Sequence, residues 1–352
     1  MSKKTVVVGM SGGVDSSVSA LLLKQLGYEV IGLFMKNWEE LDNQGICKAS
    51  REYDDVVKVC KQLQIPCYSV NFVKEYQERV FSHFLSELQQ GFTPNPDILC
   101  NREIKFKVFL EKALKLGADY LATGHYCRIS PQQELLKGND PHKDQSYFLY
   151  TLNSCILKKV LFPIGEIPKE QVRKIAKDHG LATADKKDST GICFIGKRNF
   201  KEFTGKYLPY SPGNFETTSG RIIGQHDGVA FYTLGQRKGL QIGGPGDAWF
   251  VVGKDLFRNV VLVEQGEDHP ALYKETLLAS ELSWVAGIPP GPHPFACMAK
   301  IRYRQEDQPC LIEAIEQDRA FVRFLKPQRA ITPRQSVVFY QGDLCLGGGM
   351  IL

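Results

Sequence analysis

The sequence contains no pair of cysteines spaced Cys-x-x-Cys, although it has ten cysteines. The absence of this spacing argues against a zinc ribbon and a thioredoxin-type dithiol, and it weakens the case for an iron–sulfur cluster. No apolar run is long enough to span a bilayer and no N-terminal signal pattern is present, so we expect a cytoplasmic protein without a membrane partner. In a reducing compartment most of the cysteines are expected to be small buried side chains, as at Cys60 and Cys310.

A strong charge imbalance is also lacking. The net charge of +5 over 352 residues permits a polyanionic partner but is too weak to demonstrate one. Internal repeats and low-complexity segments are absent. A hydrophobic content of 43% is ordinary for a globular chain, and the length predicts two or three domains, each with its own core.

The most informative stretch that is present covers residues 9–17, Gly-Met-Ser-Gly-Gly-Val-Asp-Ser-Ser. It follows a β-branched run and precedes apolar residues at helical spacing that end at Gly27, which predicts a strand, a tight loop and a helix. Adjacent glycines allow a sharp turn, and the helix start offers unpaired N–H groups to an anion, so we interpret the loop as a phosphate cradle. The alternative is a turn that only caps the helix. The loop lacks the Walker ending and the Gly-x-Gly-x-x-Gly pattern, which disfavours ordinary kinases and dehydrogenases.

Alternating strand and helix patterns follow this loop. Strands are expected at residues 29–35, 66–72 and 119–123, and helices at 50–63, 73–90 and 104–116. Such alternation predicts a parallel sheet with helical crossovers. Ligands of these sheets bind beyond the carboxyl ends of the strands, which places Met35, Gly124 and His125 beside the loop. For Met35 the alternative is an ordinary core residue.

The sequence pattern changes beyond a short proline-bounded stretch at 209–212. Helices are expected at 169–179 and 200–207, a linker at 209–212, and β-rich runs at 228–234, 250–253, 297–303, 310–315, 320–324 and 336–340. The last four runs alternate like the strands of a small barrel. We therefore expect an α/β part at 1–208, a small central β-rich domain at 209–275 and a C-terminal β-barrel at 276–352.

Two cysteines lie in stretches that suggest reactivity. Two prolines before Cys100 predict an irregular loop ahead of a helix that begins near Ile104, and Asp97 and Cys100 face the same way if that turn is helical. A helix N-terminus near Cys100 would lower the pKa of its thiol. Cys193 follows a cationic loop-like segment that favours thiolate and suits a sulfur carrier. Each cysteine has the alternative of a structural role, and Asp97 that of a helix N-cap.

Several motifs together resemble one known family in order and over essentially the full length. The motif at 11–17 resembles the PP-loop of the N-type ATP pyrophosphatases, and the set resembles the tRNA-specific 2-thiouridylases of that superfamily. The matching stretches are Ser-Gly-Gly-Val-Asp-Ser-Ser (11–17), Asn-Pro-Asp-x-x-Cys (95–100), Gly-His-Tyr (124–126), Lys-Asp-Gln-Ser-Tyr-Phe-Leu (143–149), Asp-Ser-Thr-Gly-Ile-Cys-Phe-Ile (188–195) and Thr-Leu-Gly-Gln-Arg (233–237). The resemblance implies a Rossmann-like, adenine nucleotide alpha hydrolase-like catalytic domain and a tRNA-binding barrel.

The resemblance also implies a role for each matching residue. Cys193 would carry a persulfide, Cys100 would be the nucleophile that later pairs with it in a transient disulfide, and Asp97 would transfer a proton. The target base would meet Asn95, Pro96 and Asp97. ATP would be held by Gly9, Met10, Ser11, Gly12, Gly13, Val14, Asp15, Ser16, Met35 and Gly124, and tRNA by His125, Lys143, Asp144, Gln145, Arg302, Tyr303 and Gln341. Arg302, Arg304 and Arg323 would grip the RNA backbone; the alternative is that these arginines lie on a solvated strand face.

The implied reaction is 2-thiolation of uridine at the wobble position (U34) of the lysine, glutamate and glutamine tRNAs. ATP, with Mg²⁺, would adenylate the C2 oxygen, and persulfide sulfur from a cysteine desulfurase or a sulfur-relay protein would replace it, giving 2-thiouridine, AMP and pyrophosphate. No metal site made of protein side chains is expected. Three alternatives stay open: a synthetase with an amine acceptor, a tRNA-binding protein that senses ATP without catalysis, and a thiolase of another base.

Overall fold

The computed structural model describes residues 3–39, 48–188, 200–209 and 211–352. A five-stranded parallel sheet with the strand order β3-β2-β1-β4-β7 forms the centre of the N-terminal part. Its strands are β1 (Thr5–Met10), β2 (Glu29–Lys36), β3 (Cys67–Asn71), β4 (Tyr120–Ala122) and β7 (Val160–Leu161). Val6, Val7 and Val8 are completely buried, because helices cover the sheet on both faces. This confirms the predicted Rossmann-like parallel sheet.

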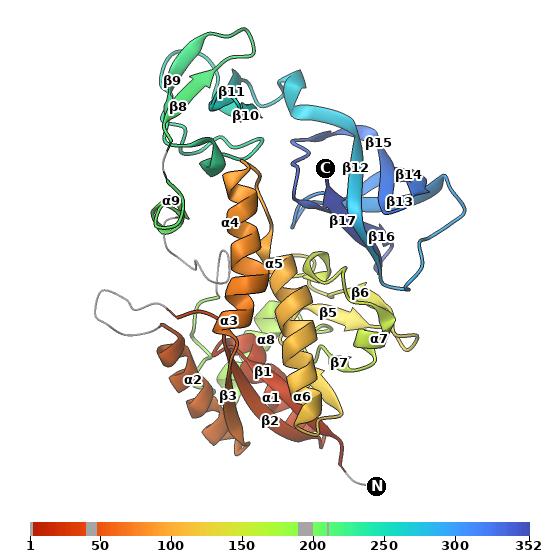
Figure 1. Ribbon diagram of the computed structural model, residues 1–352. Coiled ribbons are helices and arrows are strands. Elements are labelled where there is room, and N and C mark those ends of the chain that lie inside the picture. Colours follow the sequence, from red (N-terminus) through yellow and green to blue (C-terminus); the bar gives the residue numbers. More distant parts are fainter. Residues whose placement is uncertain (1–2, 40–47, 189–199, 210) are drawn as a thin grey trace.

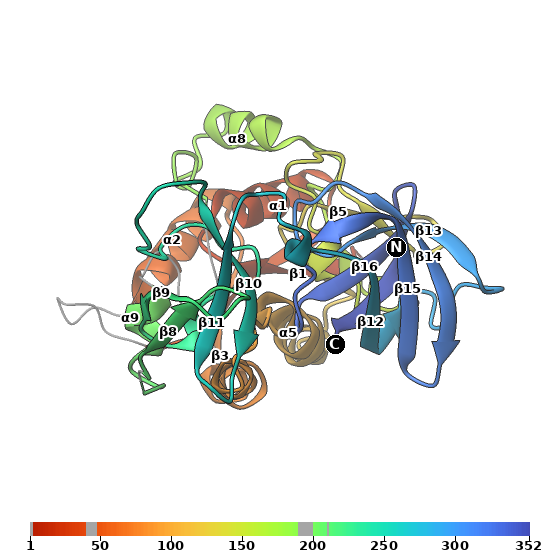
Figure 2. The same cartoon turned by 90° about the horizontal axis from the view of Figure 1, so that it is seen from above.

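Successive valines of β1 point into two different cores. Val6 and Val8 pack in one core with helices α1 (Val14–Gln25), α2 (Lys48–Leu63) and α8 (Lys169–Asp178). Figure 2 shows these three helices on the same side of β1. Val7 packs in the other core with two long helical bodies. These bodies comprise α3 (Val73–Tyr76), the π-helical η1 (Gln77–Phe81) and α4 (Ser82–Gln89), and then α5 (Pro96–Leu99), the π-helical η2 (Cys100–Phe109) and α6 (Leu110–Lys115). The alternation of β1 thus joins both helical layers to one sheet.

Two elements differ from the sequence prediction. The helix expected from Ile104 begins at Pro96, because the side chain of Asn95 caps it and proline is well tolerated in the first turn. The strand expected at 228–234 is wrong: Val229–Phe231 form a single 3₁₀ turn (η4). The alternating apolar side chains of that run pack from a loop against the core around Phe215, so they need no strand pairing.

The central part is a four-stranded sheet with the order β10-β11-β8-β9. Its strands are β8 (Gly213–Glu216), β9 (Ile222–His226), β10 (Trp249–Asp255) and β11 (Val260–Gln265), and the short helix α9 (Phe200–Thr204) precedes them. Phe215, Val251, Val261 and Val263 are fully buried between this sheet and the loops that cover it. A separate apolar core of this kind makes the central part a small β-rich domain, as predicted.

The C-terminal part is a closed antiparallel barrel, because its first strand β12 also pairs with its last strand β17. Its strands are β12 (Tyr273–Trp284), β13 (Phe295–Lys300), β14 (Gln308–Glu316), β15 (Arg319–Arg329), β16 (Ser336–Gln341) and β17 (Leu344–Ile351). The hairpin of β5 (Cys127–Ile129) and β6 (Leu135–Lys137) in the N-terminal part extends this sheet through β17. The short elements η3 (Ser146–Phe148), α7 (Ser154–Leu157) and η5 (Pro270–Leu272) complete the described fold.

The two β-rich parts lie side by side above the α/β part in Figure 1. Both hold the connection between α4 and α5. Lys254 of the central domain donates to the carbonyl of Gly91 at 2.6 Å, and Gln335 of the barrel domain donates to that of Thr93 at 2.6 Å. The stretch that leads to Asn95 and Cys100 is therefore fixed from two sides. In the described ranges, no helix combines the length and the apolar composition that crossing a membrane requires.

Candidate functional site

The glycine–serine loop, residues 9–17, turns the chain sharply between β1 and α1. Gly12 has a φ of +72°, and a Cβ atom there would lie 2.7 Å from the carbonyl oxygen of Glu52, so the turn requires glycine. Gly13 occupies the N-cap position of α1 without a side-chain cap, which leaves N–H groups of the first turn to another acceptor. Ser16 Oγ lies 3.2 Å from the N–H of Ser11 and folds the loop back on itself. This geometry suits an anion at the helix N-terminus.

The end of β4 lies directly against this loop. A Cβ atom at Gly124 would be 2.9 Å from the backbone of both Asp15 and Ser16, so the close approach of the two segments depends on glycine. Met35, at the end of β2, is half-buried and packs against the core that includes Phe109. The structure thus brings Gly124 to the loop, while Met35 retains the features of a core side chain.

Asp15 is held by two residues that the sequence analysis did not identify. Lys169 Nζ, at the start of α8, lies 2.6 and 2.8 Å from the two carboxylate oxygens of Asp15. The hydroxyl of Tyr126 donates to Asp15 Oδ1 at 2.7 Å, and burial followed by the charge of Asp15 raises the pKa of this phenol. No local signal could have revealed Lys169, because 154 positions separate it from Asp15 and it reads as an ordinary helix residue.

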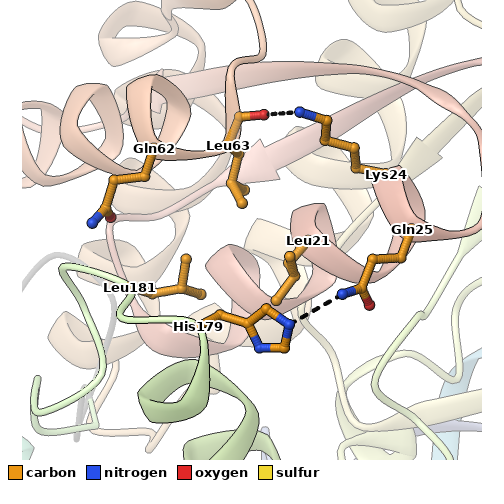
Figure 3. Close-up of a pocket in the computed structure, with 7 residues that line it drawn as sticks. All are labelled: Leu21, Lys24, Gln25, Gln62, Leu63, His179 and Leu181. Atoms are coloured by element: carbon orange, nitrogen blue, oxygen red, sulfur yellow. Dashed lines mark hydrogen bonds between the residues drawn. The ribbon is translucent and has the colours of Figure 1, made fainter.

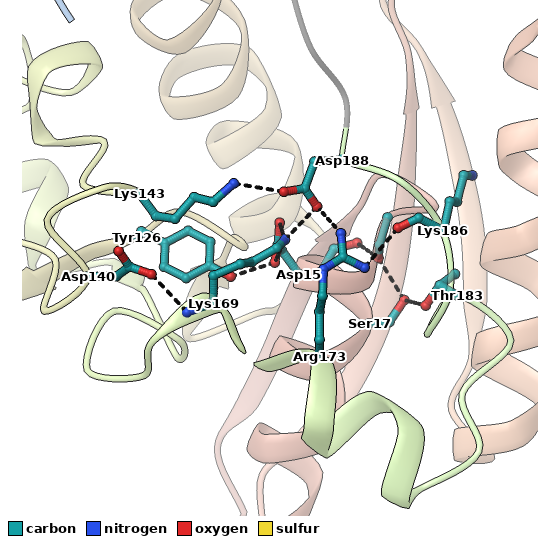
Figure 4. Close-up of polar contacts among 12 residues, drawn as sticks. Asp15, Ser17, Tyr126, Asp140, Lys143, Lys169, Arg173, Thr183, Lys186 and Asp188 are labelled. Atoms are coloured by element: carbon teal, nitrogen blue, oxygen red, sulfur yellow. Dashed lines mark hydrogen bonds and ion pairs between the residues drawn. The ribbon is translucent and has the colours of Figure 1, made fainter. Parts of the chain in front are cut away.

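The same lysine also reaches a second carboxylate. Asp188 lies 2.8 Å from Lys169 Nζ, 2.8 Å from Lys143 Nζ and 2.5 Å from a guanidinium nitrogen of Arg173. Burial raises the pKa of Asp188, but the hydrogen bonds and charges of Lys143 and Lys169 outweigh burial and lower it to about 2. Figure 4 shows Lys169 between the two carboxylates, with Lys143 and Arg173 around Asp188. We call Asp15, Lys143, Lys169, Arg173 and Asp188 the Lys169 cluster.

Cys100 is buried, 1% exposed, where α5 passes into η2. Asn95 Oδ1 accepts the N–H of Asp97 at 3.3 Å, so Asn95 is the helix N-cap and the alternative of an Asp97 cap is wrong. Asp97 is half-buried one turn before Cys100. The helical turn that would bring these two side chains to one face is therefore present. Cys193 lies outside the described residues, and so does its predicted pairing with Cys100.

The described cysteines follow the expectation of mostly buried side chains. Cys155 is exposed and Cys67 half-buried, and the other six of the eight described cysteines are buried. Burial raises the pKa of Cys345 to about 12, which keeps this thiol protonated. Such thiols are poor nucleophiles, because the thiolate is the reactive form.

Three residues that were expected to touch tRNA form hydrogen bonds inside the protein in this structure. His125 is 9% exposed, its Nδ1 lies 2.7 Å from Thr123 Oγ1, and burial with the nearby Lys105 charge holds its pKa well below 6.5. Asp144 is buried and accepts the N–H groups of Gly138 and Ser146. Gln145 Oε1 accepts the N–H of Tyr126 at 3.0 Å. These bonds set the course of the chain around Lys143.

The other expected RNA contacts lie at the barrel. One nitrogen of Arg302 donates to the carbonyls of Leu234 and Ala330, both at 2.9 Å, and joins the central and barrel domains. The alternative of a solvated strand face is therefore wrong for Arg302. Tyr303 packs its ring 4.5 Å from that of Phe148, whereas Gln341 is exposed. Arg323 is exposed on β15 and pairs with Glu313, as a solvated strand face would.

A surface hollow opens at the far end of α1 from the glycine–serine loop (Figure 3). It lies where α1, α2 and α8 end, and it is lined by Leu21, Lys24, Gln25, Gln62, Leu63, His179 and Leu181. Its polar groups bind each other: Lys24 donates to the carbonyl of Leu63, and Gln25 lies 3.2 Å from His179 Nε2. The hollow is therefore separate from the loop and its cluster.

Within the described residues, no group of three or more His, Cys, Asp or Glu side chains is arranged to hold a metal ion. Asp15 is the carboxylate within the glycine–serine loop, and one carboxylate plus phosphate oxygens is a donor set that suits Mg²⁺. The residues present fit a magnesium ion that arrives with a polyphosphate.

Comparisons with known proteins agree with this organisation. Family models match three consecutive parts of the chain: a tRNA methyl transferase HUP domain at residues 4–197, a tRNA methyl transferase PRC-barrel domain at 201–265 and an aminomethyltransferase β-barrel domain at 274–351. The tRNA-specific 2-thiouridylase MnmA of Protochlamydia amoebophila is 62% identical over 353 residues, 99% of this chain and 93% of that protein. The protein of that name from Oceanobacillus iheyensis is 57% identical, covering 98% of this chain and 94% of its own.

A parallel sheet with a glycine–serine loop after its first strand, followed by two β-rich domains, defines an α/β protein of the HUP class. The chain belongs to the tRNA-specific 2-thiouridylase family. Both the family and the three-part fold class predicted from the sequence are confirmed.

Proposed function

We propose that this chain is an ATP-dependent tRNA 2-thiouridylase that acts on uridine at the wobble position (U34) of the lysine, glutamate and glutamine tRNAs. The observation that carries the proposal is the glycine–serine loop packed against Gly124, in a chain that matches 2-thiouridylases over 98–99% of its length. The names of these relatives specify tRNA and thiouridine, which disfavours a synthetase with an amine acceptor.

In this account the loop holds the phosphates of ATP. Its N–H groups at the start of α1 and the hydroxyls of Ser11 and Ser16 are the donors, and Gly124 lets the end of β4 lie close beside Asp15. A bound magnesium ion would neutralise part of the phosphate charge, and Asp15 is the loop carboxylate that would hold this ion. The products of this half of the reaction are AMP and pyrophosphate.

The stretch from Asn95 to Cys100 receives the base. Oxygen at C2 of uracil is a poor leaving group, and its adenylation converts it into the oxygen of AMP. Asn95 caps the first helical turn and Pro96 is buried within it. Asp97 would accept and return the proton that moves as the base is activated. A wobble base in an unpaired loop leaves its stack at a cost of only about a few kcal/mol.

Sulfur then replaces the adenylated oxygen. The terminal sulfur of a Cys193 persulfide, supplied by a cysteine desulfurase or a sulfur-relay protein, adds at C2 and AMP leaves. The Cys100 thiolate attacks the Cys193 sulfur, the S–S bond of the persulfide breaks, and its outer sulfur stays on the base. A Cys100–Cys193 disulfide remains, and a thiol reductant supplies the two electrons that reopen it. Release of the outer sulfur as hydrogen sulfide before it adds at C2 gives the same balance.

RNA would be gripped around this site by His125, Lys143, Asp144, Gln145, Arg302, Tyr303 and Gln341. Lys143 supplies the charge for a backbone phosphate, and Tyr303 offers a half-buried ring beside it in the fold. The buried His125 and Asp144 contribute mainly by shaping the chain that carries Lys143. The protein would act in the cytoplasm, where uncharged and aminoacylated tRNAs are found.

An isotope experiment tests the activation step. A lysine tRNA whose wobble uridine carries a heavy oxygen isotope at C2 is incubated with the protein, Mg-ATP, cysteine and a cysteine desulfurase. Adenylation of that oxygen predicts AMP that carries the heavy isotope, because the C–O bond of the base breaks. AMP with only ordinary oxygen, formed together with 2-thiouridine, contradicts activation at the C2 oxygen.

A further inference from the structure

Lys169 has no N–H group left for a phosphate in this structure. An ammonium group has three donors, and Lys169 Nζ has three carboxylate oxygens within 2.8 Å: both oxygens of Asp15 and Oδ1 of Asp188. Its side chain is 9% exposed, so water cannot easily take over one of these bonds. As it stands, Lys169 therefore acts on Asp15 and Asp188 and not directly on a nucleotide.

A continuous chain of ionic hydrogen bonds runs from the glycine–serine loop to the stretch expected to bind RNA. Asp15 bonds to Lys169, Lys169 to Asp188, and Asp188 Oδ2 to Lys143 Nζ at 2.8 Å (Figure 4). These residues come from four separate stretches of the sequence. An RNA phosphate that binds the Lys143 ammonium competes with Asp188 for it, because two anions held by one cation repel each other and each weakens the bond of the other.

The charges of the Lys169 cluster do not cancel. Lys143, Lys169 and Arg173 are three cations, and Asp15 and Asp188 are two carboxylates, so the cluster has an excess of one positive charge. Withdrawal of Lys143 leaves one cation for each carboxylate and frees Asp188 Oδ2. Lys169 already bonds the other oxygen of Asp188 at 2.8 Å, and it can add a bond to this carboxylate only by giving up a bond to Asp15.

We propose that Lys169 and Asp188 are positioning residues that couple RNA binding at Lys143 to the readiness of Asp15 in the nucleotide site. This inference rests on the proposed function. When an RNA phosphate takes Lys143, Asp188 draws Lys169 toward itself, and an oxygen of Asp15 becomes available to the cation that accompanies the phosphates. RNA and the magnesium nucleotide then bind cooperatively, each tightening the other by the same factor.

The test measures nucleotide affinity with and without RNA. The ligand is the magnesium complex of an α,β-methylene analogue of ATP, which the protein cannot cleave, and the RNA is an unmodified lysine tRNA transcript. For the wild-type protein we expect the analogue to bind about tenfold more tightly when the RNA is saturating. Equal affinity in both conditions overturns the inference.

Two substitutions at either end of the Asp188–Lys143 bond should have opposite effects. Lys143→Met breaks the bond without RNA, so the analogue alone should bind the variant about as tightly as it binds the wild-type protein with RNA. Asp188→Asn removes the charge that draws Lys169, so the analogue should bind no more tightly than it does to the free wild-type protein, and RNA should have no effect. Weaker analogue binding in both variants overturns the inference, because that result indicates simple loss of structure.

Lys177→Met is the matched control on the same helix. Lys177 pairs with Asp185 at 3.5 Å on the surface and touches no member of the cluster in the pairs described here, so the coupling factor should be that of the wild-type protein. Melting curves of the three variants verify that each is folded. If the wild-type protein forms 2-thiouridine but binds RNA and analogue independently, the coupling is wrong and the proposed function stands; if it forms none, the function itself fails.

Discussion

The hydroxyl of Tyr126 donates a hydrogen bond to Oδ1 of Asp15, with 2.7 Å between the two oxygens. Tyr126 is 2% exposed and follows Gly124, whose close approach to the loop brings the tyrosine into place. Lys169, at the start of α8, bonds both oxygens of the same carboxylate. Asp15 therefore has a fixed orientation before any ligand binds, which is the arrangement that preorganised charge requires.

Removal of this hydroxyl should weaken nucleotide binding selectively. For Tyr126→Phe we expect the KM for ATP to rise about tenfold, which corresponds to about 1.4 kcal/mol, because a hydrogen bond to a charged group is lost while Lys169 still holds Asp15. AMP formation is measured against ATP concentration with saturating tRNA. Tyr120→Phe is the control, since its hydroxyl bonds to Lys4 at 2.8 Å on the surface. An unchanged KM for Tyr126→Phe contradicts the role of Asp15 in the nucleotide site.

A cap substitution separates stability from activity at the base site. Asn95→Ala should destabilise the protein by about 1 kcal/mol, because the N–H of Asp97 loses its cap. Asn153→Ala removes an equivalent cap, a bond from Ile156 N–H at 3.0 Å, from the short helix α7. Urea unfolding should give similar losses for both variants, whereas the rate of thiolation per folded molecule should fall only for Asn95→Ala. Equal rates in the two variants would assign Asn95 to the fold alone.

The loop-to-helix unit was accessible from sequence because its signals are local. The β-branched run of β1, the glycines at 12 and 13 and the apolar spacing of α1 all lie within one stretch. The helix begins at Pro96, earlier than predicted, because the two prolines before Cys100 also fit an irregular loop, whereas in the structure Asn95 caps a helix that starts with proline. The prolines favoured the loop prediction, whereas the cap that the Asn95 side chain forms starts the helix in the structure.

The Lys169 cluster and the barrel contacts of Arg302 could not be predicted, because they are tertiary contacts between residues that are distant in the sequence. The partners of Lys169 are distant in sequence, and a lysine in the first turn of a helix has no unusual local pattern. The strand expected at 297–303 includes Arg302, but β13 ends at Lys300. Beyond that point the guanidinium turns to the carbonyls of Leu234 and Ala330, which only the assembled domains bring together.

Buried imidazole should make the stability of the protein depend on pH in one direction. The folded-state pKa of His125 lies well below 6.5, so the unfolded state binds more protons between those two values and stability falls as the pH drops below about 6.5. His226, whose pKa burial also lowers, acts in the same sense. In His125→Asn the loss of stability on acidification should shrink by up to about 1.4 kcal/mol per pH unit.

Urea midpoints at neutral pH and at mildly acidic pH measure this effect. His179→Asn removes an exposed imidazole and serves as the control. A pH dependence for His125→Asn that equals that of the wild-type protein contradicts the assignment of a neutral, buried His125.

Substitution of the persulfide cysteine should separate the two halves of the reaction. We expect Cys193→Ser to abolish thiolation and to spare tRNA-dependent formation of AMP, because Cys193 is assigned to sulfur and not to phosphate. AMP and 2-thiouridine are quantified in the same reaction mixture. Loss of AMP formation in this variant, with tRNA binding intact, argues against the assignment.

Nucleoside mass spectrometry shows whether this chain forms 2-thiouridine in tRNA. Unmodified lysine tRNA is incubated with the wild-type protein, Mg-ATP, cysteine and a cysteine desulfurase, then digested and analysed. We expect 2-thiouridine at the wobble position when ATP is present and none when ATP is omitted. Absence of any thiolated nucleoside, with tRNA binding and an active desulfurase both verified, contradicts a 2-thiouridylase and favours a tRNA-binding protein that only senses ATP.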